Sequence, residues 1–283
     1  MSDLYENRPL TEGYPDLDQL AVDYFSKAQV QRGGDGVRIN DIVTLIGRLI
    51  PLRPDASMCV VGCGPVPYTL KVLRDRGFRA VGIEPIPGFV EKAREFLGAE
   101  DSVYQAAAEC LPLPDQSLDV VLLENVLEHV ESPFKSLNEA FRVVRPGGIA
   151  YVTTTNRQRI SLVGENGEFR VPFFNRLPKL VQESYVFSHL HYRPHLANFT
   201  RRPAVHWFSF ASLCAMGRQA GFAEFYSPLD LRRSSDVPLG GSPLRRSLRA
   251  LGLLPLIQRN PWLRALALTQ VGADVIMWRR SEP

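Results

Sequence analysis

The sequence predicts an α/β fold in which a mostly parallel sheet is covered by helices on both faces. Short apolar runs typical of buried strands alternate with longer segments whose apolar residues recur at helical spacing. Two glycines, Gly62 and Gly64, directly follow the first apolar run and precede a helical segment. This order of strand, turn and helix is typical of strand–helix–strand units with a parallel sheet.

The elements can be assigned in chain order. The predicted strands are 58–61, 79–83, 102–106, 119–123, 149–154, 222–226 and 273–278. The predicted helices are 17–30, 38–50, 67–76, 87–97, 133–144 and 209–220. Pro146, Gly147 and Gly148 predict a sharp turn into the fifth strand. The segments 157–205 and 228–271 have no clear period, and we expect them to be irregular.

Composition places the chain among ordinary globular proteins. Apolar residues make up 45% and charged residues 22% of the 283 residues, which argues against disorder. The opening residues lack the basic flank and apolar core of a signal peptide, and no apolar run is long enough to span a bilayer. The four cysteines lack zinc-site spacing, so free thiols in a reducing compartment are the simpler interpretation. We therefore expect a cytoplasmic protein.

Charge is distributed unevenly along the chain. Residues 201–283 contain 12 Arg, no Lys and 5 acidic residues, a balance of +7, which leaves −4 for residues 1–200 of a chain with net charge +3. Such a region can face acidic lipids, a phosphorylated substrate or a partner, or it can be a solvated surface. Nucleic acid is disfavoured as a partner, because the first 200 residues are net acidic and contain no recognition motif.

The turn after the first strand is the first candidate for a ligand site. Glycines at 62 and 64 let the backbone turn tightly and come close to a ligand. Glu84 ends the next strand about twenty residues later, where a carboxylate can accept both hydroxyls of a ribose. A structural turn and a surface glutamate remain the alternative on this spacing alone.

Four blocks of the sequence resemble the class I S-adenosylmethionine (SAM)-dependent methyltransferases, and more narrowly the small-molecule group related to ubiquinone and menaquinone methyltransferases. The blocks are VVGCGPVPYTL at 60–70, VGIEP at 81–85, AAECLPLPDQSLDVVLLENVLEHV at 107–130 and EAFRVVRPGGIAYVTTTN at 139–156. The resemblance implies a Rossmann-like seven-stranded sheet whose last strand is reversed, with SAM as the cofactor.

The resemblance also assigns roles to particular residues. It implies that Gly62 and Gly64 approach the methionine part of SAM, that Glu84 holds the ribose, that Ala108 and Glu109 border the adenine, and that Glu124 and Asn125 end the fourth strand beside the cofactor. Cys63 and Pro85, within the same blocks, are counted with these cofactor-binding residues. In this family a cysteine at the position of Cys63 commonly has no chemical role.

The chain departs from the family pattern at three positions. Val60 replaces the usual acidic residue, Val66 the usual third glycine and Ala107 an aspartate that often contacts the adenine. Each departure loses at most about 1 to 3 kcal/mol of hydrogen bonding or backbone freedom. The departures leave open a second class of function, a methyltransferase-like scaffold or binding subunit without catalysis.

Methyl transfer needs a positioned acceptor and, for a hydroxyl acceptor, a general base. His129 follows the fourth strand, where related enzymes place residues near the acceptor, although a structural role in the following turn is equally open. His206 is the second candidate base, and packing against Trp207 is its alternative. A metal site formed by His189, His191 and His195 is disfavoured, because no Cys or carboxylate pair accompanies them.

The domain plan places an acceptor-binding cap on a SAM-binding core. We expect N-terminal helices at 1–50, the core at 51–156, an inserted cap at 157–206 and the rest of the core at 207–283, with the basic insertion 228–271. The cap follows the fifth strand, so it begins at the edge where open α/β sheets bind ligands. Its aromatic residues can exclude water from an acceptor, although an irregular segment that completes the core is the alternative.

The expected acceptor is a small molecule or a lipid-linked saccharide, methylated at oxygen. Residues 155–179 resemble a segment of methyltransferases associated with bacterial cell-surface polysaccharide synthesis, through Asn156, Arg157, Pro172 and 177–179. Trp262, Leu263, Leu266 and Leu268, with nearby arginines, suggest a helix on a membrane surface. Packing of these four residues against the sheet is the favoured alternative.

Overall fold

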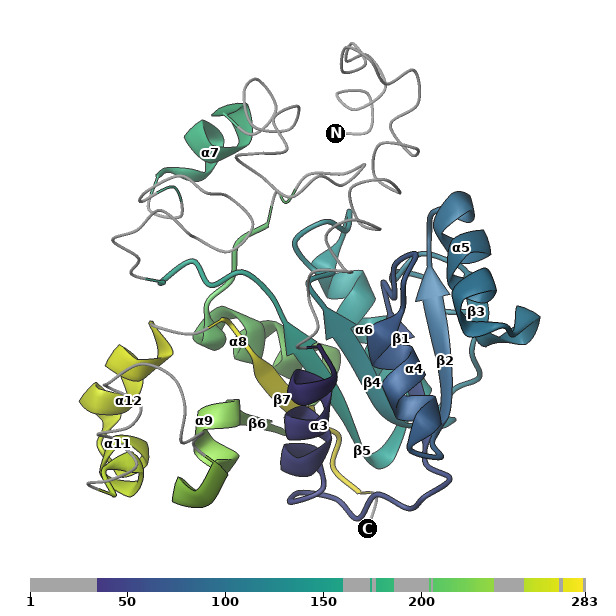
Figure 1. Ribbon diagram of the computed structural model, residues 1–283. Helices are drawn as coiled ribbons and strands as arrows, with labels where there is room; N and C mark the ends of the chain where they lie inside the picture. The colour runs from purple at the N-terminus through teal and green to yellow at the C-terminus, as the bar shows by residue number, and fades with distance from the viewer. Residues whose placement is uncertain are drawn as a thin grey trace.

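The computed structural model contains one seven-stranded sheet with the order β3-β2-β1-β4-β5-β7-β6 (Figure 1). The residues it describes are 35–159, 174, 177–185, 204, 206–236, 252–269 and 272–281. The strands are β1 (Ser57–Val61), β2 (Arg79–Glu84), β3 (Val103–Gln105), β4 (Leu118–Glu124), β5 (Val144–Thr153), β6 (Glu224–Tyr226) and β7 (Val275–Trp278). The predicted α/β class and all seven predicted strands are confirmed, with shifts of a few residues at their ends.

The sheet is parallel except for its last strand. β1 pairs in parallel with β2 and β4, β2 with β3, and β4 with β5. β7 runs antiparallel to both β5 and β6 and lies between them. This arrangement confirms the predicted reversal of the last strand. It also brings the carboxyl ends of the first five strands to one edge of the sheet, hereafter called the carboxyl edge.

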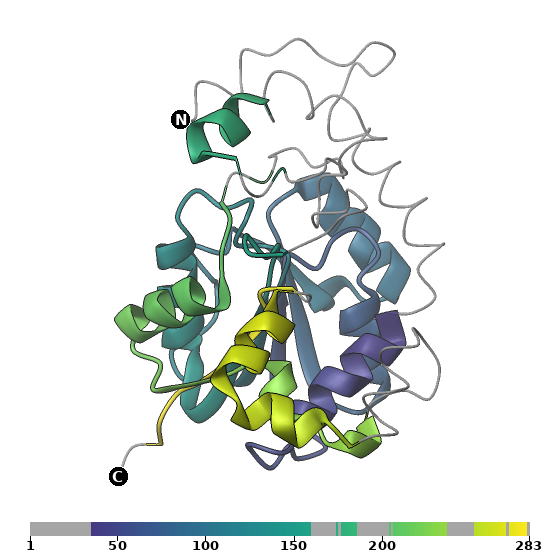
Figure 2. The same cartoon turned by 90° about the vertical axis from the view of Figure 1, so that its left-hand side faces the viewer.

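Helices cover both faces of the sheet, as Figure 2 shows with the sheet seen nearly edge-on. The helices α3 (Asp35–Ile46), α4 (Tyr68–Asp75) and α5 (Pro87–Leu97) contribute buried residues to the core on one face. The helices α6 (Pro133–Val143) and α8 (Phe210–Ala220) contribute to the core on the other. Successive strand residues point to opposite faces, so β4 supplies both cores: Val121 and Leu123 to one, Val120 and Leu122 to the other.

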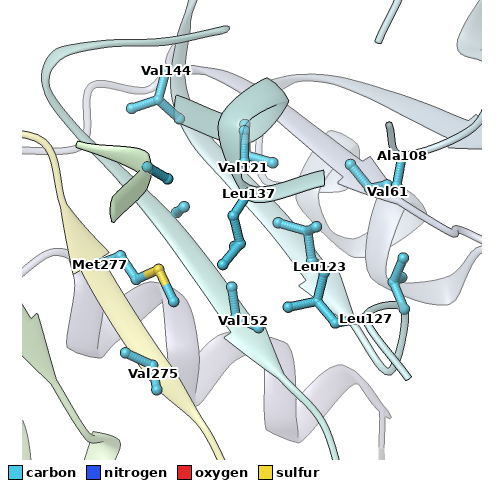
Figure 3. Close-up of a cluster of buried hydrophobic side chains, with 14 of the residues drawn as sticks. Val61, Ala108, Val121, Leu123, Leu127, Leu137, Val144, Val152, Val275 and Met277 are labelled. Atoms are coloured by element: carbon cyan, nitrogen blue, oxygen red, sulfur yellow. The ribbon is translucent and has the colours of Figure 1, made fainter. Parts of the chain in front are cut away.

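The core beneath α6 is built from branched aliphatic side chains. Figure 3 shows Leu137 of α6 next to Val121, Leu123 and Val152 of the central strands, and all four residues are at most 1% exposed. Each such side chain contributes about 1.5 to 3 kcal/mol by leaving water. Because this packing fixes β4 and β5, it also fixes the side chains that follow them at the carboxyl edge.

Two expectations about irregular regions are wrong. The predicted turn at 146–148 is part of β5, where the pairing with β4 shifts so that Leu118 faces Val144 and Val120 faces Ile149. Gly148 permits the close approach there, because an added Cβ would lie 2.8 Å from the Asp119 carbonyl oxygen.

The second wrong expectation is the irregular insertion 228–271, whose described residues form short helices. They are α9 (Pro228–Leu231), the 3₁₀ helix η4 (Ser234–Asp236), α11 (Leu254–Arg259) and α12 (Pro261–Leu268). A further helix, α7 (Lys179–Tyr185), lies in the predicted cap, and the 3₁₀ helix η1 (Glu100–Ser102) precedes β3. The rest of the predicted cap and the predicted helix 17–30 lie outside the described residues.

Ion pairs attach α3 and the turn after it to the C-terminal part of the chain. Arg48 donates two hydrogen bonds to the Asp236 carboxylate, at 2.6 and 2.9 Å, and Arg232 pairs with Asp41. The Arg48 guanidinium holds the pKa of the Asp236 carboxyl well below its usual range. Within the described ranges, no helix combines the length and apolar character needed to cross a membrane.

Candidate functional site

The glycine turn after β1 adopts a backbone that other residues would strain. Gly62 and Gly64 have φ angles of +66° and +69°. A Cβ added at Gly62 would lie 2.6 Å from Cγ2 of Val126, which is closer than nonbonded atoms approach. The amides of Gly62 and Cys63 donate to the Ile83 carbonyl oxygen at 2.7 and 3.1 Å. The turn is therefore tied to the end of β2, and glycine is required at position 62.

Glu84 is joined to this turn through its side chain. Its Oε2 accepts a hydrogen bond from the Gly64 amide at 3.0 Å, and its Oε1 accepts one from the Ile86 amide at 3.1 Å. The residue is 4% exposed. Burial raises the pKa of the Glu84 carboxyl to about 7, although the two amide hydrogen bonds favour the ionised form. A buried carboxylate thus marks the carboxyl edge between β1 and β2.

The turn and Glu84 fit a nucleoside. Each carboxylate oxygen has two lone pairs and accepts one amide hydrogen bond, which leaves acceptor capacity for the two hydroxyls of a ribose. A Cβ at Gly62 would clash with Val126, so the missing side chain lets Val126 pack directly against the turn. Pro85, the next predicted cofactor residue, is exposed at the same edge. The contacts of these residues with the ribose and the methionine part of SAM stay predictions.

Cys63 is unsuited to nucleophilic chemistry. Its side chain is 8% exposed and packs in the core beneath α4. Burial raises the pKa of the thiol, and the neighbouring Glu84 carboxylate raises it further. Cys63 can therefore contribute only its backbone to a ligand at the turn.

Glu109 has a structural partner that the sequence did not reveal. Its Oε1 accepts hydrogen bonds from the Glu131 amide at 2.8 Å and the Ser132 amide at 3.2 Å, just before α6 begins. Ala108 is 6% exposed and packs in the core, whereas Ala107 is exposed. The Glu109 side chain therefore ties the loop after β3 to the start of α6, and a contact with adenine by this loop stays a prediction.

The end of β4 carries the next predicted pair. Oε2 of Glu124 accepts a hydrogen bond from Oγ1 of Thr69 at 2.8 Å, and its Oε1 lies 4.0 Å from Nε of Arg38. Asn125 is exposed and has a φ of +54°, a left-handed conformation that asparagine tolerates better than most residues. Its amide donates to the Thr153 carbonyl oxygen at 2.8 Å. The two residues therefore lie at the carboxyl edge, as predicted.

A polar cluster that sequence analysis missed continues from Glu124 toward β7. It consists of Arg38 on α3, Tyr151 and Thr153 on β5, and Asp274 just before β7. Nη2 of Arg38 donates to Oγ1 of Thr153 at 2.9 Å, and the Arg38 side chain is 46% exposed. Burial raises the pKa of the Asp274 carboxyl, and the positive charge of Arg38 partly offsets this effect.

Two oxygen atoms in this cluster are buried without hydrogen bonds. The Tyr151 hydroxyl and Oδ1 of Asp274 have no hydrogen-bond partner among the described residues. An unsatisfied buried polar atom costs about 1 to 3 kcal/mol. The sequence gives a weak signal for this cluster: an acidic residue directly precedes the last strand, and an arginine lies beside the apolar stripe of a helix. Neither signal indicates that α3 packs where Arg38 reaches Thr153 at the end of β5.

The two candidate bases differ in their surroundings. His129 is half-buried in the turn after β4, and its amide donates to the Val126 carbonyl oxygen at 2.9 Å. Nε2 of His206 lies 3.0 Å from the Val130 carbonyl oxygen, which can only accept a hydrogen bond. Nε2 of His206 must therefore carry a proton, so only Nδ1 could act as a base. The ring of His206 makes a tilted contact with Phe208, at 6.3 Å between ring centroids, and its packing on Trp207 stays a prediction.

A few residues of the predicted cap, 157–206, are described by the structure. Phe174 is fully buried and contacts Tyr185 and Trp207, with ring centroids 6.2 and 6.0 Å apart. Nε2 of Gln182 donates to the Phe174 carbonyl oxygen at 2.7 Å. His189, His191 and His195 lie outside the described residues, and no metal-binding group of His, Cys, Asp or Glu occurs within them.

Comparison with known sequences identifies the central part of the chain. Residues 59–152 match the family model described as methyltransferase domain. An uncharacterised methyltransferase of Mycobacterium avium is 38% identical over 96 residues, which are 34% of this chain and 38% of that protein. One from Mycolicibacterium vanbaalenii is 32% identical over 126 residues, which are 42% of this chain and 49% of that protein. The chain thus spans less than half the length of either relative.

Comparison with solved structures supports the fold. The complex between the Haloferax volcanii Trm112 methyltransferase activator and a methyltransferase contains a similar chain, with a TM-score of 0.53 and 19% identity over 94% of this chain and 97% of that one. An S-adenosylmethionine-dependent methyltransferase of Mesorhizobium loti has a TM-score of 0.50 and 14% identity over 83% and 96%. Residues 59–152 therefore match a methyltransferase domain, and the chain shares its fold with these two solved chains.

Proposed function

We propose that the protein transfers the methyl group of SAM to an oxygen atom of a small-molecule or lipid-linked saccharide acceptor. The observation that carries the SAM-dependent part is the unit formed by Glu84 and the glycine turn. The carboxylate is buried, it is held by the Gly64 and Ile86 amides, and it lies at the carboxyl edge between adjacent strands. Burying a carboxylate costs stability unless its oxygen atoms accept hydrogen bonds, and ribose hydroxyls are suitable additional donors.

The chemistry requires little from the protein beyond placement. When bound, SAM would supply a methyl group on a sulfonium, and the sulfur would keep the electron pair of the broken bond as the acceptor oxygen takes the methyl group. Glu84 and the glycine turn orient the nucleoside, while the Asn125–His129 turn borders the β4 end of the edge. A hydroxyl acceptor loses its proton, and His129 is the better placed of the two predicted bases because it lies in the turn after β4.

We also propose that the protein acts in the cytoplasm and that it is related to the ubiquinone and menaquinone methyltransferases. Support for the saccharide comes from the sequence after β5. In the structure, Nδ2 of Asn156 donates to the Leu268 carbonyl oxygen at 2.7 Å, and Oδ1 of Asn156 accepts from the Gln158 amide at 2.9 Å. Asn156 therefore shapes the start of the cap, and the neighbouring Arg157 is exposed.

Calorimetric titration of the full chain with SAM and with S-adenosylhomocysteine tests the cofactor site. We expect binding of both, and we expect Glu84→Ala to weaken it by about 1.5 to 3 kcal/mol, because the variant loses charge-assisted hydrogen bonds to the ribose. Glu95→Ala is the matched control: it removes the same charge from an exposed position on α5, where Glu95 pairs with Lys92. This control variant should bind as tightly as the wild type.

Two results would contradict the proposal. Unchanged affinity in a folded Glu84→Ala variant would remove Glu84 from the site. Absence of binding by the wild type at millimolar cofactor would instead favour a scaffold or binding subunit, the function left open by Val60, Val66 and Ala107. Thermal unfolding of each variant separates loss of the site from loss of the fold.

A further inference from the structure

The helices α11 and α12 turn apolar side chains toward solvent. In α12, Trp262, Leu263 and Leu266 are 85%, 37% and 58% exposed, and none of the helix residues is buried. In α11, Leu256 is 54% exposed. The favoured expectation that these residues pack against the sheet is therefore wrong for the three exposed α12 residues. These four exposed side chains are called the outer face below.

Polar residues hold the same two helices to the protein. Arg264 of α12 donates two hydrogen bonds to the Asp230 carboxylate, at 2.6 and 2.7 Å. Gln258 of α11 donates to the carbonyl oxygens of Leu229 and Arg232, at 2.8 and 2.9 Å. An ordinary surface helix has the opposite arrangement, with apolar residues inward and charged residues outward. The hydrogen bonds of Arg264 and Gln258 therefore hold the two helices with the outer face toward solvent.

The three α12 residues of the outer face lie on one helical arc. Positions 262, 263 and 266 are one and four residues apart, so their side chains project to one side of α12. The yellow helices α11 and α12 lie outside the β6 end of the sheet in Figures 1 and 2. Single exposed apolar residues are common on proteins, whereas a tryptophan and three leucines on adjacent helices indicate a binding surface.

Charge distinguishes between kinds of partner. Residues 237–273 contain five arginines, at 245, 246, 249, 259 and 264, and no lysine, aspartate or glutamate. Arg264 is neutralised by Asp230, and Arg259 is exposed beside the outer face. An anionic lipid bilayer accommodates both features, because apolar side chains enter the acyl boundary while guanidinium groups bind lipid phosphates. Tryptophan is favoured at this interface, since its ring is apolar and its N–H is polar.

We propose that the outer face of α11 and α12 docks the protein on an anionic lipid bilayer. The end of α12 is attached to the carboxyl edge, because Nδ2 of Asn156, three residues after β5, donates to the Leu268 carbonyl oxygen. Docking through α12 therefore places the candidate site next to the membrane, where a lipid-linked acceptor would be available. The membrane contact itself does not depend on the proposed methyl transfer.

Vesicle sedimentation of the full chain tests the proposal directly. The wild type should bind mixed phosphatidylcholine–phosphatidylglycerol vesicles, leave pure phosphatidylcholine vesicles largely unbound, and dissociate as sodium chloride is raised. Trp262→Ser with Leu266→Ser should lower the partition coefficient by about tenfold or more, because it removes the two most exposed side chains of the outer face. Phe134→Ser is the matched control, since Phe134 is a 39% exposed apolar residue on α6.

A spectroscopic readout locates the contact. The chain has three tryptophans, of which Trp207 and Trp278 are partly buried and Trp262 is exposed. Anionic vesicles should therefore shift the emission of the wild type to shorter wavelength and leave the emission of a Trp262→Ser variant unchanged. Circular dichroism and thermal unfolding of each variant verify the fold.

Three outcomes would overturn the proposal. The first is no binding of the wild type to anionic vesicles at low salt. The second is wild-type binding by the folded double variant. The third is self-association in sedimentation equilibrium that Trp262→Ser abolishes while vesicles stay unbound, which would make the outer face a contact between copies of this chain.

Discussion

The two ends of the carboxyl edge hold their acidic residues in different ways. At the β1–β2 end, Glu84 is held by the backbone amides of Gly64 and Ile86, which are supplied by the adjoining turns. At the β4–β5 end, Glu124 is held by the side chain of Thr69 and approached by that of Arg38, from helices distant in sequence. Backbone geometry therefore determines the first end, and tertiary packing of side chains determines the second.

This difference predicts how each end responds to mutation. A site made by backbone conformation should tolerate changes at most neighbouring side chains but fail at the glycine that permits the conformation. Where side chains form the site, each single substitution should lower the free energy of unfolding by a smaller amount. The effects of substitutions at residues that share a partner should not be additive.

The largest expected effect is that of Gly62→Ala. The variant combines a φ of +66° with a Cβ 2.6 Å from Cγ2 of Val126, so we expect a loss of about 2 to 4 kcal/mol in the free energy of unfolding. Nucleoside binding should be lost as well, because the turn must move. Urea unfolding and titration with methylthioadenosine measure the two effects.

Two other glycines distinguish the effect of the positive φ from the effect of the close Cβ contact. Gly98 has a φ of +63° but open space around an added Cβ, so Gly98→Ala should cost only about 1 kcal/mol. Gly88 has open space and no positive φ, so Gly88→Ala in α5 should be neutral or stabilising. Equal losses in all three variants would show that the close contact at Gly62 does not decide the outcome.

The second prediction concerns the other end of the edge. Arg38→Met should lower the free energy of unfolding by about 1 to 3 kcal/mol, because the Asp274 carboxylate loses its compensating charge. Asp274→Asn alone should cost less, since burial already disfavours the ionised form of this carboxyl. The double variant should be more stable than the sum of the single effects predicts.

A double-mutant cycle in urea tests this coupling. Additive effects of Arg38→Met and Asp274→Asn would mean that Arg38 acts through Thr153 or Glu124 instead. Thr44→Val is a suitable control on α3, because its hydroxyl only donates to the Asn40 carbonyl within the exposed helix surface.

The smallest expected effect is a pH dependence of nucleoside affinity. Glu84 has a pKa of about 7 in the free protein, and ribose hydroxyls donate to its ionised form, so binding should release a proton. Affinity for methylthioadenosine should therefore rise by about tenfold from pH 6 to pH 8. This ligand is suitable because it lacks the amino and carboxyl groups of SAM.

Glu84→Gln provides the comparison for the pH series. Its affinity should be independent of pH over the same range and lower than that of the wild type at pH 8, because the amide is neutral. A flat profile in the wild type would show that the carboxyl is already ionised at pH 6. The free energy of unfolding has the opposite dependence on pH. The folded protein binds the Glu84 proton more tightly than the unfolded chain does, so the contribution of Glu84 to this free energy falls as pH rises through 7.

Sequence analysis succeeded where local pattern determines structure. Apolar runs located all seven strands, and the spacing from Gly62 to Glu84 located the first end of the carboxyl edge. It failed where distant segments meet: Arg38 and Asp274 are 236 positions apart in number, and no local pattern joins them. It also failed for α12, because the amphipathic pattern that predicts a buried face does not say which face is buried.

The position of β7 has a consequence for synthesis of the chain on the ribosome. β6 pairs with β7 and not with β5, and β7 itself pairs with β5. The strand β6 therefore emerges before its neighbour exists, and the sheet cannot close until residue 278 has left the exit tunnel. During that interval the edge of β5 is unpaired and exposed to other chains. A nascent chain of this protein should need protection from aggregation longest at β5, and a stop codon before Val275 should leave both β6 and the edge of β5 unpaired.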